Sequence, residues 1–313
     1  MTATPRATPT PPPRYRFHTA DVFTQRRFGG NPLAVFPDAR GLTATQMATL
    51  AREFNLSETV FVLPPADPAN TRRLHIFTPG RELPFAGHPT VGAAFVLAAL
   101  GEIATPTAET RIVFEEGVGL VPVMIHSRDG APRFTQLTVA QLPVLGAPAP
   151  SPAAAAAMLS LSPDDIVHEE NALQIVSCGI PFLMIPLRSR EALRDAKPRA
   201  DLFRATLGPT KTTEVYVFWD DGARVHARMF VLDPELKEDP ATGSACACLG
   251  GYLSWRGRTP RGSTSTIRVE QGVDMGRPSV LEVEVDTARD GAVTGVRVGG
   301  ASVLVAEGII YSS

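Results

Sequence analysis

The chain has 313 residues, of which 44% are apolar and 20% charged, and its net charge is −2. This composition is typical of a soluble globular protein of roughly two domains, and it lacks the basic footprint of a nucleic-acid-binding protein. No stretch approaches the roughly 20 apolar residues that cross a membrane, and the N-terminus lacks the apolar core of a signal peptide. We therefore expect a cytoplasmic protein with no nucleic-acid or membrane partner.

The first part of the chain is predicted to combine strands with helices. Residues 1–13 are rich in Pro and Thr, and we expect them to be disordered. Strands are predicted over 15–22, 33–36, 60–63 and 71–78, and a hairpin over 111–126. A helix is predicted to begin after Thr43 as N-cap, because apolar residues follow at helical spacing: Met47, Leu50, Ala51 and Phe54.

The stretch from Arg81 to Leu100 is predicted to hold a central helix. No charged residue occurs from Pro89 to Leu100, so this helix must be buried on every side. Pro89 suits the first helical position, where its missing N–H costs nothing. The N-terminus carries Gly87, His88 and free backbone N–H groups, which bind anions and developing negative charge.

The same stretch recurs weakly after a shift of 156 residues. Three residue types are repeated and His is replaced by Ser: Glu82, Pro84, Gly87 and His88 fall on Glu238, Pro240, Gly243 and Ser244. The recurrence indicates a duplicated fold with two equivalent helix ends. Glu, Pro and Gly are common near turns, however, so coincidence is the alternative.

The rest of the chain is predicted to repeat the first unit after a linker or loop over 146–152. Strands are predicted over 173–176, 182–187, 214–218 and 225–231, with mainly helix over 190–207. A second uncharged helix ends near Trp255, and four further strands follow over 266–271, 279–285, 293–298 and 301–310. We expect an N-terminal half over 14–130, joined by the last strand at about 301–313, and a C-terminal half over 131–300.

Glu58, His88 and Asp239 are the candidate acid/base groups. A carboxylate entering a buried strand must be paired or protonated, which also tunes a general acid or base, although Glu58 could merely cap a turn with Ser57. His88 at a helix N-terminus favours the neutral imidazole, or it could only hydrogen-bond a loop. Asp239 could face His88 across a shared cleft, or simply favour the dipole of the second helix.

No metal or cofactor motif stands out. The odd number of cysteines argues against a disulfide framework, and Cys246 and Cys248 would lie on different sides of a helix and chelate a metal poorly. The chain lacks a nucleotide-binding glycine loop after a strand, a Walker loop and a nucleophile elbow. Schiff-base chemistry is limited to three lysines, of which Lys237 lies near the second motif. We expect no cofactor and no metal.

Four segments, in this order, resemble the PhzF family, named for phenazine biosynthesis: DVFTQRRFGGNPLAVF, NLSETVFV, ELPFAGHPTVGAA and EDPATGSA. The resemblance runs from about Tyr15 to the C-terminus and extends, more distantly, to diaminopimelate epimerase and the proline racemases. It implies an α+β fold of two pseudo-symmetric diaminopimelate-epimerase-like halves. Each half would be a mostly antiparallel sheet wrapped around a central helix, with the active site in the cleft between them. It also implies a homodimer.

The resemblance implies roles for particular residues. Glu58 matches the main acid/base of the family, with His88 and Asp239 as the further catalytic candidates. The expected substrate-binding residues are Asn31, Ser57, Gly87, Gly243 and Ser244. The epimerases and racemases use two cysteines where this chain has Ala86 and Thr242, so two-thiol racemisation is not expected.

The resemblance therefore implies a cofactor-independent isomerase that moves a proton between carbons of a small carboxylate-bearing substrate. That substrate would be trans-2,3-dihydro-3-hydroxyanthranilate or an analogue. An epimerase, racemase or lyase that uses His88 and Asp239 as opposed bases is an alternative, as is a carboxylate-binding protein without turnover.

Overall fold

The computed structural model describes residues 13–312 apart from 171, 211, 233 and 234, so all but the last residue of the predicted disordered segment 1–13 lies outside the described residues. The helices are α1 (Ala44–Phe54), α2 (Gly87–Ala99), α3 (Pro152–Met158), α4 (Arg190–Asp195), α5 (Ala200–Leu207) and α6 (Gly243–Trp255). The strands of the first part are β1 (Arg14–Val22), β2 (Asn31–Phe36), β3 (Glu58–Leu63), β4 (Arg72–Phe77), β5 (Glu82–Leu83), β6 (Glu109–Glu116), β7 (Gly119–Arg128) and β8 (Ala131–Thr138). Those that follow are β9 (Val144–Leu145), β10 (Gln174–Ser177), β11 (Pro181–Pro186), β12 (Glu214–Asp220), β13 (Val225–Leu232), β14 (Leu236–Asp239), β15 (Thr264–Gln271), β16 (Ser279–Thr287), β17 (Val293–Gly300) and β18 (Ser302–Tyr311).

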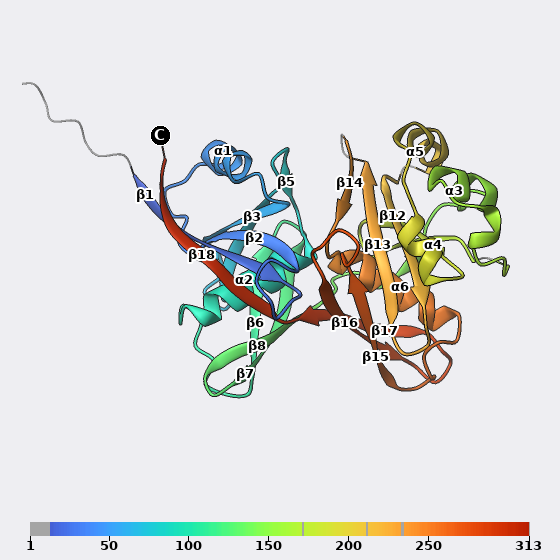
Figure 1. Cartoon of the computed structure of the whole chain (residues 1–313). Helices are drawn as coiled ribbons and strands as arrows, with labels where there is room; N and C mark the ends of the chain where they lie inside the picture. Colours follow the sequence, from blue (N-terminus) through green and yellow to red (C-terminus); the bar gives the residue numbers. More distant parts are fainter. Residues whose placement is uncertain (1–12, 171, 211, 233–234, 313) are drawn as a thin grey trace, which may run out of the picture.

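The strands form two sets with the same pairing pattern (Figure 1). In the first set, β1 pairs with β2, β2 runs parallel to β3, β3 pairs with β4, and β4 pairs with β5 and runs parallel to β6, which continues into β7 and β8. In the second set, β10 to β17 repeat every one of these pairings in the same order. The predicted α+β fold with two pseudo-symmetric, mostly antiparallel halves is therefore confirmed.

The two halves are joined through strands at both edges. β8 pairs with β17, which makes the sheet continuous. The last strand, β18, returns to pair with β1, and the short β9 pairs with β10 in the equivalent place. Thus β18, which follows the second half in the chain, borders the first half, and β9, which follows the first half, borders the second. Because β8 pairs with strands of both halves, the predicted boundary near residue 130 stays a prediction.

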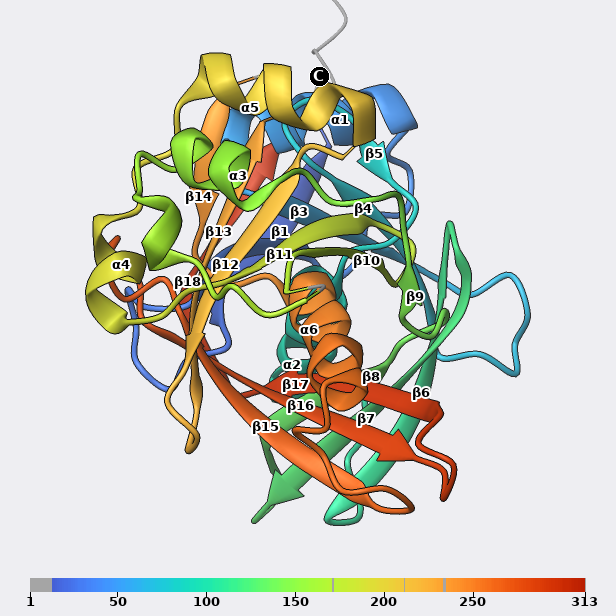
Figure 2. The same cartoon turned by 90° about the vertical axis from the view of Figure 1, so that its right-hand side faces the viewer.

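A buried helix lies at the centre of each half (Figure 2). Twelve of the 13 residues of α2 and 11 of the 13 residues of α6 are buried, as their lack of charge predicts. Small residues let the sheets approach: a Cβ on Gly92 would lie 2.5 Å from Leu33 Cδ2. The helix α2 begins at Gly87 and not at Pro89. Proline is tolerated there because an N–H within the first turn has no intrahelical partner in any case.

The remaining helices cover the outer faces of the sheets. α1 packs against the first sheet with Phe36 and Phe61, and Thr43 caps it as predicted. α3, α4 and α5 cover the second sheet. The range 190–207, predicted as mainly helix, is mainly helical, but it is divided into α4 and α5, because Pro198 lies between them and the residue before a proline disfavours helical geometry. In the described part of the chain, no helix is long and apolar enough to cross a membrane.

Candidate active site

The N-termini of α2 and α6 meet where the two halves face each other. A Cβ on Gly87 would lie 3.3 Å from Gly243 Cα and 3.4 Å from Ser244 N, so only glycine permits this approach without a shift of the neighbouring backbone. Each helix N-terminus carries about half a positive charge. Two such ends in contact repel each other unless negative charge lies beside them, so the arrangement favours an anion.

Both of these helices lack a side-chain cap. Neither Ala86 before α2 nor Thr242 before α6 accepts a hydrogen bond from the first turn of its helix. In contrast, α1, α3 and α4 are capped by Thr43, Ser151 and Ser189. The first N–H groups of α2 and α6 are therefore open to a ligand, since they have no intrahelical partner.

Glu58 stands beside these helix ends, at the start of β3 and in register with Leu33 of β2. Its side chain is only 16% exposed, and its Oε2 lies 3.4 Å from His88 Nε2. Burial, together with the nearby charge of Asp239, raises the pKa of Glu58 to about 8. The carboxyl is therefore mostly protonated at neutral pH.

The pseudo-equivalent residue of the second half, Glu214, lies in a different environment. It also begins its strand, β12, but its Oε2 accepts a hydrogen bond from the Thr213 N–H at 3.1 Å. In contrast, Glu58 Oε2 is buried without a hydrogen-bond partner among the described residues. The duplication therefore supplies two similar strand starts, of which Glu58 is the one with the unsatisfied carboxyl oxygen.

His88 is neutral, and burial is the main cause. Burial lowers the pKa of His88 to about 3, opposed by a hydrogen bond to the backbone of Pro32. Proline has no N–H, so its carbonyl accepts, and because Nε2 has no hydrogen-bond partner the donor is Nδ1. The Nε2 lone pair then faces Glu58. The contact between Glu58 and His88 is thus a neutral acid and a neutral base, and not an ion pair.

Asp239 approaches from the second half, as the last residue of β14. Its Oδ1 accepts a hydrogen bond from Asn31 Nδ2 at 2.9 Å, and its Oδ2 accepts one from the Thr242 hydroxyl. Burial raises the pKa of Asp239 to about 6, while these two hydrogen bonds act in the opposite direction. Of the two carboxyls at the site, Asp239 is therefore the stronger acid.

The predicted substrate-binding residues fall into two groups. Asn31 is fully buried and bridges the halves, since its Nδ2 also donates to the Ala241 carbonyl at 2.9 Å. It therefore holds Asp239 in place. Ser57 and Ser244 are half-buried, and within the described residues neither hydroxyl has a hydrogen-bond partner. Contact of these residues with substrate stays a prediction.

Two residues behind Asp239 have a role that the sequence did not predict. Thr242 and Gln271 bind Asp239 and each other through side-chain and backbone hydrogen bonds. A lone Gln at the end of a strand matches no motif, and its role depends on burial between segments distant in sequence.

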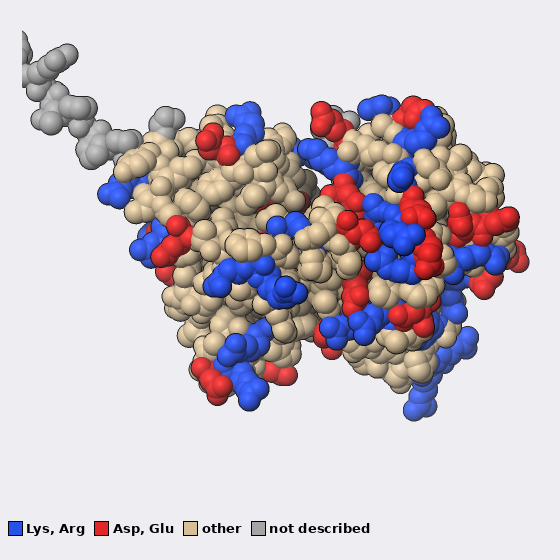
Figure 3. Space-filling view, in the orientation of Figure 1, with Lys and Arg blue, Asp and Glu red and all other residues tan. Residues whose placement is uncertain are grey.

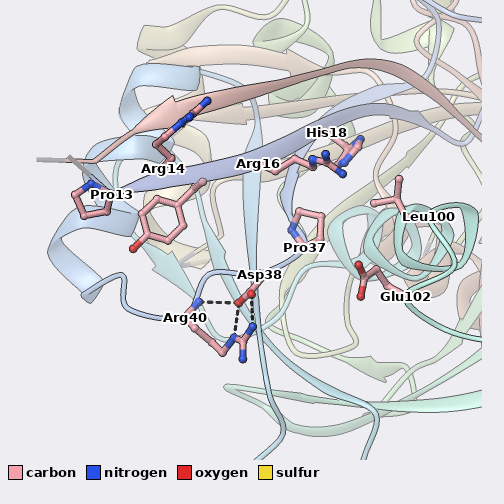
Figure 4. A pocket seen from close by; sticks show the side chains of 10 residues that line it. Pro13, Arg14, Arg16, His18, Pro37, Asp38, Arg40, Leu100 and Glu102 are labelled. Carbon is pink, nitrogen blue, oxygen red and sulfur yellow. Dashed lines mark hydrogen bonds and ion pairs between the residues drawn. The ribbon is translucent and has the colours of Figure 1, made fainter. Parts of the chain in front are cut away.

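The surface is hollowed between the two halves, at the top of the view in Figure 3. A separate cavity of about 500 Å³ lies near the far end of α2, where Leu100 and Glu102 line it with the ion pair of Asp38 and Arg40 (Figure 4). None of the predicted site residues lines this cavity. Among the described residues, no group of three or more His, Cys, Asp or Glu side chains is placed to hold a metal ion.

Another buried carboxyl, Glu116 at the end of β6, contacts α2 away from His88. It is 8% exposed, its Oε1 lies 2.7 Å from Thr90 Oγ1, and burial raises the pKa of Glu116 to about 8. Folded Glu58 and Glu116 thus retain protons that the unfolded chain releases. Their contribution to stability is full below about pH 4.5 and is lost as the pH rises through about 8.

The free energy of unfolding is therefore expected to fall between pH 6.5 and 9, and Glu116→Gln should flatten this fall by about 2 kcal/mol. Urea unfolding at pH 6.5, 7.5, 8.5 and 9 measures the effect. The window avoids His88, whose lowered pKa affects stability only below about pH 6.5. Glu115→Gln is the matched control, since hydrogen bonds from Ala66 and Asp67 hold the pKa of Glu115 down at about 2. An equal alkaline decline in Glu116→Gln and wild type would contradict the assignment.

Comparison with known proteins gives a consistent result. Residues 20–308 match the family model PhzC-PhzF, described as phenazine biosynthesis-like protein. An uncharacterised isomerase of Mesorhizobium japonicum is 39% identical, covering 93% of this chain and 97% of the relative. The trans-2,3-dihydro-3-hydroxyanthranilate isomerase of Pseudomonas aeruginosa is 32% identical, covering 95% and 99%. The crystal structure of a phenazine biosynthesis protein of the PhzF family from Bacillus anthracis superposes with a TM-score of 0.82 at 23% identity, covering 95% and 99%.

Proposed function

Because this chain is an isomerase of the PhzC-PhzF, phenazine biosynthesis-like family, we propose that it moves a proton between two carbons of a small carboxylate-bearing substrate by acid/base catalysis. The substrate class is trans-2,3-dihydro-3-hydroxyanthranilate or a close analogue. The observation that supports this proposal most is the buried neutral pair of Glu58 and His88 beside two uncapped helix N-termini.

The helix ends account for binding of the carboxylate. The N–H groups at Gly87 and His88, and at Gly243 and Ser244, belong to two helix N-termini in close contact, where negative charge is favourable. The free hydroxyls of Ser57 and Ser244 can donate to the same group. Negative charge that develops during proton removal is stabilised by the same donors, which are already in place before the reaction.

Glu58 carries the proton transfer. A group that both takes and returns a proton works best with a pKa near the operating pH, and the pKa of Glu58 is raised to about 8. The fraction of Glu58 that is ionised near neutral pH can remove a proton from a carbon next to an unsaturated or carboxyl-bearing centre. Glu58, or Asp239 with His88, returns a proton at another carbon.

Two-thiol racemisation lacks its groups in this site. Ala86 has no acidic proton, and the Thr242 hydroxyl donates to Asp239 and so is not placed as a base toward a substrate carbon. Removal of a proton by a carboxyl group is therefore the chemistry that these residues support.

Incubation of the protein with trans-2,3-dihydro-3-hydroxyanthranilate in D2O is expected to give an isomer that carries deuterium at the carbon receiving the proton. Proton NMR measures both conversion and the position of the label, and heat-inactivated protein is the control. Inversion of trans-4-hydroxyproline, tested in parallel, would favour the epimerase alternative. Binding of carboxylates without conversion or hydrogen exchange at carbon would contradict an enzymatic function.

A further inference from the structure

The side chain of Gln271 is fully buried behind the site, at the end of β15. Its Nε2 donates to the Asp239 carbonyl at 2.8 Å and to Thr242 Oγ1 at 3.0 Å. Its Oε1 accepts from the Tyr216 hydroxyl at 3.1 Å and from the Thr242 N–H at 3.3 Å. Every donor and acceptor of this amide is used.

The orientation of the Gln271 amide is fixed by its two backbone partners. The Thr242 N–H can only donate, so Oε1 must face it, and the Asp239 carbonyl can only accept, so Nε2 must face that group. A flipped amide would place two acceptors together at one end and two donors together at the other. The Thr242 N–H and the Asp239 carbonyl therefore fix which end of the Gln271 amide donates and which end accepts.

This polarity determines where the hydroxyl proton of Thr242 points. The oxygen of Thr242 already accepts from Gln271 Nε2, so its single proton is directed at Asp239 Oδ2. Asn31 is fixed in the same way, because its Nδ2 donates to the Ala241 carbonyl as well as to Asp239 Oδ1. Asp239 thus faces a donor on each oxygen, which suits a carboxylate and leaves no acceptor for a protonated form.

We infer that Gln271 is a positioning residue that directs the Thr242 hydroxyl onto Asp239, so that Asp239 is the carboxylate of the site and Glu58 carries the proton. This inference rests on the proposed function for its catalytic meaning. Glu58 Oε2 receives no hydrogen bond, so the two carboxyls, which repel each other as anions, divide their roles according to this one network.

This network of hydrogen bonds orients the Thr242 hydroxyl, and it provides no path for a proton from Asp239 to solvent. Beyond Gln271, the partner of the Tyr216 hydroxyl among the described residues is Cys246 Sγ, at 3.2 Å, and both residues are fully buried. Burial raises the pKa of the Cys246 thiol to about 12 and raises that of Tyr216 well above its usual value. Neither group therefore ionises near neutral pH, and the chain of hydrogen bonds ends inside the protein.

Other titratable and charged groups around Asp239 must be kept constant in a test. Glu58, Tyr216, Glu238 and Cys246 interact electrostatically with Asp239. His88 contacts Glu58, and Arg228 pairs with Glu238. The substitutions that test the network leave all of them in place; Glu58 is changed only to identify its resonance, and Tyr216 only as a control.

The test is a pH titration by 13C NMR of the full-length protein with labelled Asp and Glu carboxyl carbons. Asp239→Asn and Glu58→Gln identify the two resonances by their loss. In the wild type we expect Asp239 to titrate near 6 and Glu58 near 8. The reverse order would overturn the inference without any variant of the network.

Substitutions at Thr242, Gln271 and Tyr216 then measure how much each side chain contributes to the titration midpoint of Asp239. Thr242→Val should raise the midpoint of Asp239 by about one pH unit or more, and Gln271→Met should raise it by about half as much. Thr242→Ser, which keeps the hydroxyl, should retain the wild-type midpoint, and so should Tyr216→Phe, which leaves both donors of Gln271 in place.

An unchanged Asp239 midpoint in folded Thr242→Val or Gln271→Met would overturn the inference, and so would a shift in Tyr216→Phe as large as that in Gln271→Met. If Gln271→Met does not fold, two results still test the inference. These are the difference between Thr242→Val and Thr242→Ser, and the order in which Asp239 and Glu58 titrate in the wild type. The titration needs no turnover. Absence of isomerase activity would therefore refute the proposed function alone, and an unshifted midpoint would refute only this inference.

Discussion

Glu58→Gln is expected to lower kcat by about 100- to 10,000-fold while the protein remains folded. The amide has the shape of the protonated carboxyl that the buried site already holds, so the packing around His88 is kept. It cannot take a proton from a substrate carbon. The loss should appear in kcat more than in KM, because the helix N-termini that bind the carboxylate are unchanged. Steady-state kinetics on the substrate identified in the D2O experiment measures this.

Glu116→Gln is the matched control for this substitution. Glu116 is also buried, its pKa is also raised to about 8, and it also packs against α2, through Thr90. It lies outside the pair of Glu58 and His88, so its substitution should leave kcat within about twofold of the wild type. Near-normal turnover in Glu58→Gln, or an equal loss in both variants, would contradict the assignment of Glu58 as the acid/base.

Asp239→Asn is expected to lower kcat by about 100-fold or more and to shift the pH profile of the residual activity. Asn31 and Thr242 each donate to one oxygen of Asp239. Whichever way the amide of Asn is turned, its NH2 group would therefore face a donor. The charge of Asp239 helps to raise the pKa of Glu58. Its removal should therefore lower that pKa and move the limb of the profile that reports Glu58 to lower pH.

Glu238→Gln is the matched control, because it removes a carboxylate from the neighbouring position of β14. Glu238 is the preceding residue of β14, but its carboxylate pairs with Arg228 at 2.8 and 2.9 Å. Its substitution should retain most of the activity and leave in place the limb of the pH profile that reports Glu58. Equal losses in the two variants would indicate that β14 is merely damaged by substitution, and an unshifted profile in Asp239→Asn would argue against coupling between Asp239 and Glu58.

The parts of the fold that depend on local pattern could be predicted from the sequence. The absence of charge from Pro89 to Leu100 was enough to place a fully buried helix, and the recurrence at Glu238 indicated the second one. Segments whose structure depends on distant partners could not be predicted. β14, with the sequence LKED, is polar and short, and it is a strand because β13 pairs with it.

The candidate site divides in the same way. Glu58, His88 and Asp239 follow recognisable segments, and the structure brings them into one site from β3, α2 and β14. The roles of Thr242 and Gln271 could not be predicted, because both depend on which carboxyl is buried beside them. The direction of the Thr242 hydroxyl follows from four hydrogen bonds of Gln271, and none of them is local to Gln271 in the sequence.

The exchange of border strands has a consequence for the order in which the protein folds. β9, the border strand of the second half, is synthesised before the other strands of that half. The second half is therefore complete as soon as β17 has been synthesised. The first half leaves the ribosome earlier but lacks its border until β18 emerges, since Arg14 pairs with Tyr311. Contacts between the two ends of a chain form slowly, because a very long loop must close first. The half that carries Glu58 and His88 is therefore begun first and completed last, and β1 has an unpaired edge throughout synthesis.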